Sequence, residues 1–405
     1  MKSTDQKSPE HLLEKSRSER VNEFKKCWAG HRKIAEARDQ VMRYIREPAN
    51  VVVIHLVGPT GVGKSTLLRH ILKKVNEDAL PEMEKRPGWI PAAYMLAENP
   101  QNGVYNWTEH FKQTMEALNE VLIERKIDVP DPGATQGNLD GVITRGRQPP
   151  HVYRRAAEKS LRGRECNVFI IDDAHYILKR RSGEQIINQA DTIKSVAEQS
   201  GTLHLLAGTY DLLPLRNLNG QHGRISVTVR FSNYKYQDSE DVNSFIGVLK
   251  FFMSKLPLAQ KPDFKEHWEF CYAMSAGCVG VLKDWFVRSL DVAISENKGV
   301  MTFELFKSCK PPTSVISKIA EEISMGEEKL EKDESDDAYS TLNKLLGMGD
   351  NRLPSEHNAV VTDKANQSFD TGSLTGDITN NGKKKRGKIE TKPRRHPVGL
   401  NDDSL

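Results

Sequence analysis

The sequence predicts an α/β fold in which helices flank a parallel sheet, a small helical lid follows, and a disordered tail ends the chain. Three observations lead to this prediction. Short apolar runs alternate with helical patterns, which is typical of a parallel sheet covered on both faces. A glycine-rich turn joins the first apolar run to a helix, and the chain beyond residue 313 loses its apolar pattern and becomes polar and charged.

The first core strand is the apolar run 51–57, and amphipathic sequence precedes it. Residues 17–46 carry apolar side chains at helical spacing with basic residues between them, which predicts one or two helices. Pro48 ends that pattern. The chain therefore enters its sheet after a helical N-terminal segment, residues 1–48.

A phosphate-binding loop follows the first strand directly. The order strand, glycine-rich turn and Lys-Ser at a helix start is the context in which such a P-loop works, because backbone N–H groups and the helix N-terminus attract phosphate. We expect Lys64 to reach the β- and γ-phosphates and Ser65 to ligate Mg²⁺. The residues predicted to contact the nucleotide, ATP or GTP, are Gly58, Pro59, Thr60, Gly61, Val62, Gly63, Lys64, Ser65 and Thr66. The structural alternative is a glycine-rich turn that binds nothing.

Two further strands are expected at 92–96 and 166–171, with a helix over 107–125 and a loop over 130–150 between them. The later strand is apolar and ends in two acids, Asp172 and Asp173. At the carboxyl edge of a parallel sheet these acids would face the nucleotide, Asp172 orienting Mg²⁺ and Asp173 activating water. An Asp-Asp helix cap is the structural alternative.

Another strand, 203–209, ends at the polar residue Thr209, and helices are expected over 241–310. Three arginines lie within about twenty residues of Thr209: Arg216, Arg224 and Arg230. Glycines then precede Lys283 at a helix start, from which its side chain could swing toward the phosphates. The predicted divisions are a nucleotide-binding core over 49–238, a lid over 239–312 and a tail over 313–405.

Composition excludes several classes of protein. No run approaches the roughly 18 apolar residues of a membrane span, so a cytoplasmic protein without membrane contact is expected. The five cysteines have neither zinc-site nor disulfide spacing, which favours reduced thiols. A net charge of +4 is too small to indicate nucleic-acid binding alone, but the segment 383–395 is strongly basic.

These motifs together resemble the TnsC/TniB-type AAA+ regulators of Tn7-like DNA transposition. The resemblance covers roughly residues 20–310 and rests on five segments: 58–66 (Walker A), 170–175 (Walker B), 206–209, 217–221 and 277–285. The first two are common to many ATPases and the last two are more specific. The resemblance implies an AAA+ core, ATP and Mg²⁺ as cofactors, and assembly on double-stranded DNA as a ring or filament, with six or seven subunits expected. It also implies a bacterial protein of a mobile element that couples a target-selector protein to the transposase subunits.

The resemblance assigns roles to single residues. Asp172 takes the Walker B role and Thr209 the sensor role, and Lys283 joins the nucleotide site. Asp173 stands where most AAA+ proteins have glutamate, and its shorter reach implies slow, DNA-stimulated ATP hydrolysis. An arginine finger acting on the neighbouring subunit is expected at Arg224, with Arg230 second.

By the same resemblance, DNA contacts lie in loops and helix starts between the second strand and the Asp strand. The candidates are Lys112, Arg145, Arg147, Arg154 and Arg155, each with a solvated surface charge as its alternative. The basic segment 383–395 could bind DNA or an acidic transposase surface.

Three other functions stay open from the sequence. A DNA-replication AAA+ ATPase, such as a helicase loader or initiator, would share the core, but an initiator should add a sequence-reading domain after residue 310. A small-molecule phosphotransferase would need no partner arginine. A signalling scaffold would hold nucleotide without hydrolysing it, and the presence of Asp173 in place of the usual glutamate keeps this function open.

Overall fold

The computed structural model describes residues 13–100, 103–125, 150–179, 182–216, 220–296, 299–333 and 335–348. Its centre is a five-stranded sheet in the order β2-β3-β4-β1-β5, with every pairing parallel. The strands are β1 (Val53–Val57), β2 (Ala92–Leu96), β3 (Val168–Asp172), β4 (Leu203–Gly208) and β5 (Ser226–Arg230). The carboxyl ends of these strands therefore meet at one edge, where ligands bind in open α/β sheets.

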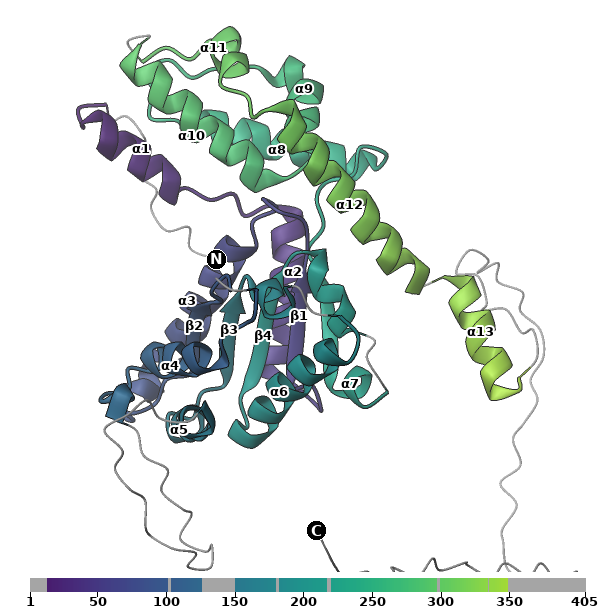
Figure 1. Ribbon diagram of the computed structural model, residues 1–405. Helices are drawn as coiled ribbons and strands as arrows, with labels where there is room; N and C mark the ends of the chain where they lie inside the picture. The colour runs from purple at the N-terminus through teal and green to yellow at the C-terminus, as the bar shows by residue number, and fades with distance from the viewer. Residues whose placement is uncertain are drawn as a thin grey trace, which may run out of the picture.

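Helices cover both faces of the sheet, as predicted (Figure 1). The core helices are α2 (Arg32–Arg46), α3 (Lys64–Met83), α4 (Trp107–Ala117), α5 (Pro150–Gly163), α6 (Glu184–Ser200) and α7 (Gly220–Ile225), with short 3-10 turns η2 (Ile123–Arg125), η3 (Ala174–Leu178) and η4 (Tyr210–Leu215). Alternate residues of β3 serve opposite layers. Ile170 packs with α2 and α3, while Phe169 and Ile171 pack with α4, α5 and α6.

The edge strand β5 is absent from the sequence prediction. Its five residues pair with β1 from Val53↔Ser226 to Val57↔Arg230, yet only Val229 is buried. The other four side chains of β5 are only partly buried, so polar residues are tolerated along it. The polar residues Ser226, Thr228 and Arg230 interrupt the apolar run, so the strand is not predicted from the sequence.

A second apolar core forms the lid. It comprises α8 (Ser239–Lys255), η5 (Lys265–His267), α9 (Trp268–Ala273), α10 (Val279–Ser295) and α11 (Phe303–Ser308). Trp285 stacks on Phe306 at its centre, with ring centroids 4.1 Å apart. The N-terminal helix α1 (Arg17–Lys26) also packs here through Val21 and Phe24, whereas α2 packs on the sheet. The N-terminal segment is thus divided between lid and core.

The sequence-predicted disordered tail differs from the structure over residues 313–346. These residues form α12 (Thr313–Asp333) and α13 (Asp336–Leu346) (Figure 1). The apolar side chains of α12 recur at helical spacing, and acidic residues between them outweigh that pattern in composition. Residues 349–405, with the basic segment 383–395, lie outside the described residues.

The described part of the chain holds no helix with both the length and the apolarity to span a bilayer. Its five cysteines are free thiols, three of them buried. Among the described residues no group of three or more His, Cys, Asp or Glu side chains has a metal-binding arrangement.

Acid should destabilise the core through its buried histidines. Burial lowers the pKa of His110 to about 3 and that of His204 to about 4. In the unfolded chain these histidines have a pKa of about 6.5, so below that pH they bind protons that they do not bind in the folded chain. The free energy of unfolding therefore falls from about pH 6.5 toward pH 4, by about 1.4 kcal/mol per pH unit for each histidine. Urea unfolding at pH 7, 6 and 5 measures this slope.

His204→Gln removes one of these groups and should make the slope shallower. His151, exposed at the start of α5, provides the matched control, since His151→Gln should leave the slope unchanged. Equal slopes for the parent and His204→Gln would contradict the assignment of acid sensitivity to this histidine.

Candidate nucleotide-binding site

The P-loop joins β1 to α3 at the carboxyl edge of the sheet. Gly61 and Gly63 adopt φ angles of +76° and +116°, a region that side chains disfavour, and this lets the loop curl before α3 begins at Lys64. The ammonium of Lys64 donates to the carbonyl oxygens of Gly58 and Pro59, both at 2.9 Å. The loop thus holds its lysine inside the concave turn where phosphate is expected.

The environment of the Lys64 ammonium suits an anionic ligand. Burial lowers the pKa of this ammonium to about 8, against the opposing effect of acidic groups led by Asp172. A bound phosphate would favour the charged form, because an opposite charge at short range offsets the loss of hydration. Lys64 is therefore a strong anchor for phosphate.

The two acids after β3 are placed differently from each other. Asp172 is buried, and its carboxylate accepts hydrogen bonds from the Asp173 amide at 2.9 Å and the Tyr94 hydroxyl at 3.0 Å. Asp173 has a φ of +51°, and its side chain is 40% exposed. An aspartate in this left-handed region is uncommon and occurs often at functional sites. Asp172 is held rigidly while Asp173 stays accessible to water.

Tyr94 is a site residue that sequence reasoning missed. It is the third residue of β2, and pairing of β2 with β3 brings its hydroxyl to Asp172. Burial, with the neighbouring Asp172 charge, raises the pKa of Tyr94 to about 12, so it stays a hydrogen-bond donor. Strand order supplies this contact, and no local motif signals it.

The residues present fit a magnesium ion. Mg²⁺ prefers oxygen ligands and is usually held in nucleotide sites by one or two protein groups together with phosphates and water. The Ser65 hydroxyl at the start of α3 and the Asp172 carboxylate supply that chemistry, and the two hydrogen bonds to Asp172 leave lone pairs for an ion. When bound, Mg²⁺ would neutralise phosphate charge.

The sensor candidate Thr209 lies immediately after β4, beside the acids. Its hydroxyl donates to the Asp211 carboxylate at 3.3 Å. His175, on η3, lies 3.9 Å from Asp173, and burial lowers the pKa of its imidazole. Polar groups from β3 and β4 therefore meet at this edge, as the sequence predicts.

The lid contacts the P-loop through the start of α10. The amide of Val281 donates to the carbonyl of Gly61 at 3.2 Å. Lys283 is not brought to the phosphate loop in this structure, because its ammonium donates instead to the Lys25 carbonyl of α1 at 2.6 Å. The contact of the lid with the P-loop is made by backbone and apolar atoms.

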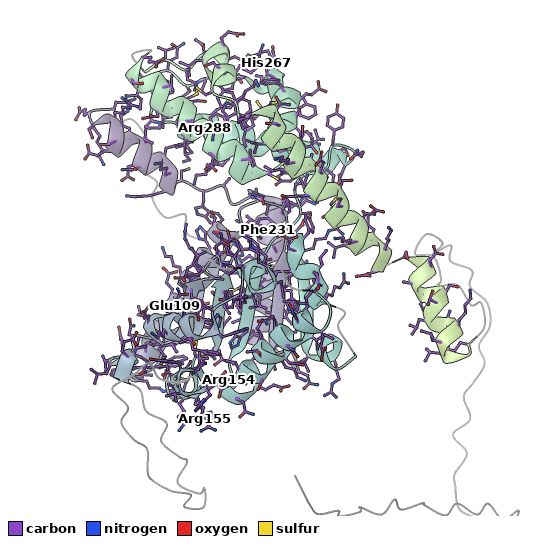
Figure 2. The ribbon with its side chains drawn as sticks, in the orientation of Figure 1. Glu109, Arg154, Arg155, Phe231, His267 and Arg288 are labelled. Carbon is purple, nitrogen blue, oxygen red and sulfur yellow. The ribbon has the colours of Figure 1, made fainter. Side chains whose placement is uncertain are left out.

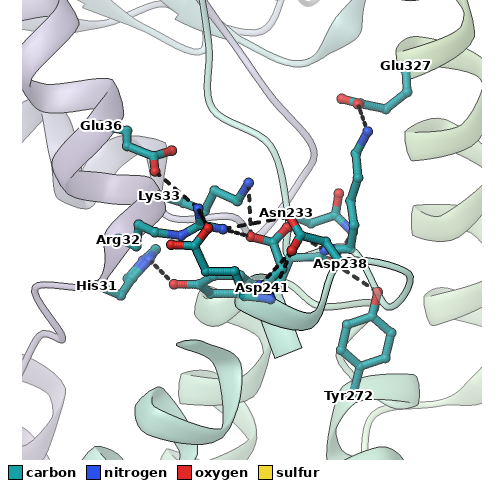
Figure 3. Close-up of polar contacts among 12 residues, drawn as sticks. His31, Arg32, Lys33, Glu36, Asn233, Asp238, Asp241, Tyr272 and Glu327 are labelled. Carbon is teal, nitrogen blue, oxygen red and sulfur yellow. Dashed lines mark hydrogen bonds and ion pairs between the residues drawn. The ribbon is translucent and has the colours of Figure 1, made fainter. Parts of the chain in front are cut away.

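The connection between core and lid is fixed by a polar cluster (Figure 3). Asp241 of α8 is fully buried and pairs with Arg32 and with Lys33, the latter at 3.1 Å. His31 contacts the hydroxyl of Tyr234 at 3.0 Å. Because His31, Arg32 and Lys33 lie at the start of α2, this cluster joins the sheet layer to the first lid helix.

The arginines after Thr209 occupy three different settings. Arg224 is exposed on α7. Arg230, the last residue of β5, forms an ion pair with Glu327 of α12, and Arg216 lies 3.6 Å from Asp333 at the end of the same helix. Of the two finger candidates, Arg224 is thus the one presented to solvent.

The described DNA candidates lie on the adjacent helices α4 and α5. Lys112 and Arg154 are paired within the core, with Glu124 at 2.7 Å and Glu158 at 2.8 Å. Arg155 is exposed on α5. Phe231 lies beside the P-loop, and Figure 2 shows Arg155 at the opposite end of the core from Phe231. Arg145 and Arg147 lie outside the described residues.

The carboxyl end of β2 borders a cavity of about 650 Å³ whose charged lining residues are Glu98 and Glu109. Carboxylates repel DNA phosphates, so this cavity does not support a duplex contact. The DNA contacts that the resemblance implies in this part of the core stay a prediction for Lys112, Arg154 and Arg155.

Comparison with protein families identifies the domain type of the core. Residues 49–215 match the family model described as AAA domain, and this segment is an AAA-type P-loop ATPase domain with the AAA+ fold. No curated protein matches the chain.

Several solved structures are similar to the chain at 14–15% identity. The Aeropyrum pernix ORC2 protein, in ADPNP–ADP complexes, has a TM-score of 0.45, with 68% of this chain and 66% of that chain covered, just under two thirds of its length. The Walker-type ATPase paby2304 of Pyrococcus abyssi has a TM-score of 0.39, with 78% and 79% covered. Cdc6p from Pyrobaculum aerophilum has a TM-score of 0.39, with 74% and 66% covered.

Proposed function

Because residues 49–215 form an AAA-type P-loop ATPase domain, we propose that this protein is an ATP-dependent regulator of DNA transposition. In this proposal it binds ATP with Mg²⁺, assembles with further copies of itself on duplex DNA, and couples a target-selector protein to recruitment and activation of the transposase subunits. Slow hydrolysis then limits the lifetime of the assembly.

The balance of charge at the nucleotide site is the observation that supports assembly of several copies of the protein. Four acids act on Lys64 and His175, and Lys64 is a buried cation among them. The acids are Asp172, Asp173, Asp211 and Glu322. ATP would bring about four further negative charges, and one Mg²⁺ with one lysine balances only part of them. A cation from a neighbouring copy, Arg224 in our assignment, would complete the site.

The transposition role is supported by two of the motifs shared with that family. The segment 277–285 forms the entrance to α10, where Val281 contacts Gly61. Residues 220–221 of the other segment begin α7, while 217–219 lie outside the described residues. The first motif thus adjoins the P-loop, and the second precedes Arg224, the arginine expected to act on a neighbouring subunit.

A DNA-replication AAA+ ATPase is the alternative. An initiator should follow its lid with a sequence-reading domain, whereas residues 313–346 form α12 and α13, and α12 packs along the core. A helicase loader or an initiator would share the nucleotide-binding core, and experiment separates either of them from a transposition regulator.

A reconstituted reaction separates these functions. The purified protein, the transposase subunits, a target selector, ATP and duplex DNA should give strand transfer that depends on Lys64. Electron microscopy with a slowly hydrolysed ATP analogue should show assemblies on the same DNA. Loading of a replicative helicase without any strand transfer would overturn the proposal in favour of the alternative.

Asp173→Asn should retain ATP binding and slow turnover by about 10²-fold or more, because the metal-orienting Asp172 stays in place while the water-activating group is lost. Steady-state phosphate release and nucleotide affinity, measured on one preparation, give both quantities. Asp39→Asn, an exposed substitution on α2, serves as the control. Turnover at the parent rate would show that Asp173 is not the base.

A further inference from the structure

Helix α12 spans the lid and the core on the side of the nucleotide site (Figure 1). At its start Ile316 and Ile319 pack in the apolar core of the lid, and near its end Leu330 packs in the core of the sheet. One rigid helix therefore contacts both parts of the molecule. Its middle crosses the carboxyl edge of the strands, where the P-loop, Thr209 and Arg230 lie.

The middle of α12 is fitted closely to that edge. Gly326 lies against the Tyr210 ring so tightly that a Cβ would overlap it. The next residue, Glu327, is buried, accepts a hydrogen bond from the Tyr210 hydroxyl at 2.7 Å, and pairs with Arg230. Lys235 lies 3.6 Å from the same carboxylate. A charge this well enclosed by partners marks a specific contact, and separating it from them costs free energy.

A second acid of α12 reaches the P-loop itself. The hydroxyl of Thr60 donates to the Glu322 carboxylate at 3.4 Å, and Glu322 is among the acids that act on Lys64. A triphosphate held by Lys64 would place like charge near this carboxylate, and like charges at short range repel. Docked α12 and bound ATP thus compete for the same cationic loop.

We propose that α12 is an acidic strap that closes the edge of the nucleotide site and is released when ATP binds. Release frees Arg230 and the strand edge around Tyr210, so a neighbouring copy can approach only a nucleotide-loaded subunit. This regulation rests on the proposed function, since it presupposes that Lys64 binds ATP and that copies assemble. ATP shifts the strap only by the difference in its affinity for the two states.

Hydrogen exchange on the full chain tests the release directly. Adding a slowly hydrolysed ATP analogue with Mg²⁺ should increase exchange at amides of residues 320–333 while the P-loop gains protection. The measurement is made at low protein concentration, so that assembly does not mask the exposed edge. Unchanged or greater protection of α12 in the presence of bound nucleotide would overturn the proposal.

Nucleotide affinity provides the second test. Glu327→Gln weakens the strap and contacts Arg230 and Tyr210 rather than the P-loop, so it should tighten ATP binding about tenfold by removing charge-assisted contacts that favour the docked state. Glu328→Gln is the matched control, because Glu328 is exposed and pairs with Lys332 one turn away at 2.7 Å. Equal ATP affinity for the parent, Glu327→Gln and Glu328→Gln would contradict the strap.

Two further variants separate the possible failures. Glu322→Gln, at an exposed position, should raise affinity without risk to folding, and circular dichroism checks that Glu327→Gln is folded. Lys64→Ala reports on the proposed function. If parent and Lys64→Ala bind ATP equally, nucleotide binding at this loop fails and the strap fails with it. If binding depends on Lys64 but α12 exchange and the Glu327→Gln affinity stay at parent values, only the strap fails.

Discussion

Lys64→Ala should weaken ATP binding by about 10- to 150-fold and abolish nucleotide-dependent assembly. The charge-assisted contacts that the ammonium makes to phosphate are worth about 1.5–3 kcal/mol. Lys64 also lies among the site acids, so its removal leaves the phosphates near carboxylates whose charge it partly offsets. Titration of a fluorescent ATP analogue against both proteins measures the loss.

Lys73→Ala is the matched control for this experiment. Lys73 lies on the same helix, α3, but is exposed and pairs with Glu77 one turn away at 3.5 Å. An exposed pair of this kind contributes little to stability, so this variant should bind ATP like the parent. Parent affinity in Lys64→Ala would remove the P-loop from the binding site and with it the proposed function.

Local signals in the sequence were sufficient to predict the phosphate loop and its immediate neighbours. The strand before the loop, the turn itself and the helix that starts at Lys64 are contiguous, so one short segment specifies the whole device. The strand predicted over 92–96 coincides with β2, and β3 ends at Asp172 as expected. Strands β1 and β3 are buried along their whole length, and continuous apolar runs make such strands recognisable in the sequence.

Contacts between distant segments could not be predicted in the same way. Tyr94 meets Asp172 only because β2 pairs with β3, and Lys283 lies against α1 because that helix packs on the lid. The strap α12 was hidden by its composition, since the acids that make its sequence look disordered are those that bind Arg230 and Thr60. Charged residues are mostly exposed, so the sequence alone predicts that they are solvated, and their buried partners are known only from the fold.

Arg224→Ala should lower ATP turnover by about 10³-fold while leaving nucleotide affinity within a few-fold of the parent. An arginine supplied in trans stabilises charge that develops only in the transition state, and its loss has effects of this order. Arg224 is exposed on α7, where a neighbouring copy can meet it. Turnover measured across a range of protein concentrations should rise steeply for the parent and stay flat for the variant.

The control and a mixing experiment complete the test of Arg224. Arg288 is exposed on α10 in the lid (Figure 2), so Arg288→Ala should keep parent turnover. Mixing Arg224→Ala with Lys64→Ala should restore part of the turnover, because an interface between the two variants joins one intact P-loop to one intact arginine. Such recovery requires an arginine that acts across subunits, since neither variant contains a complete site. If Arg224→Ala alone turns over like the parent, Arg224 is not the finger. Arg230 would then take its place, and because Glu327 holds that side chain, turnover would depend on release of α12.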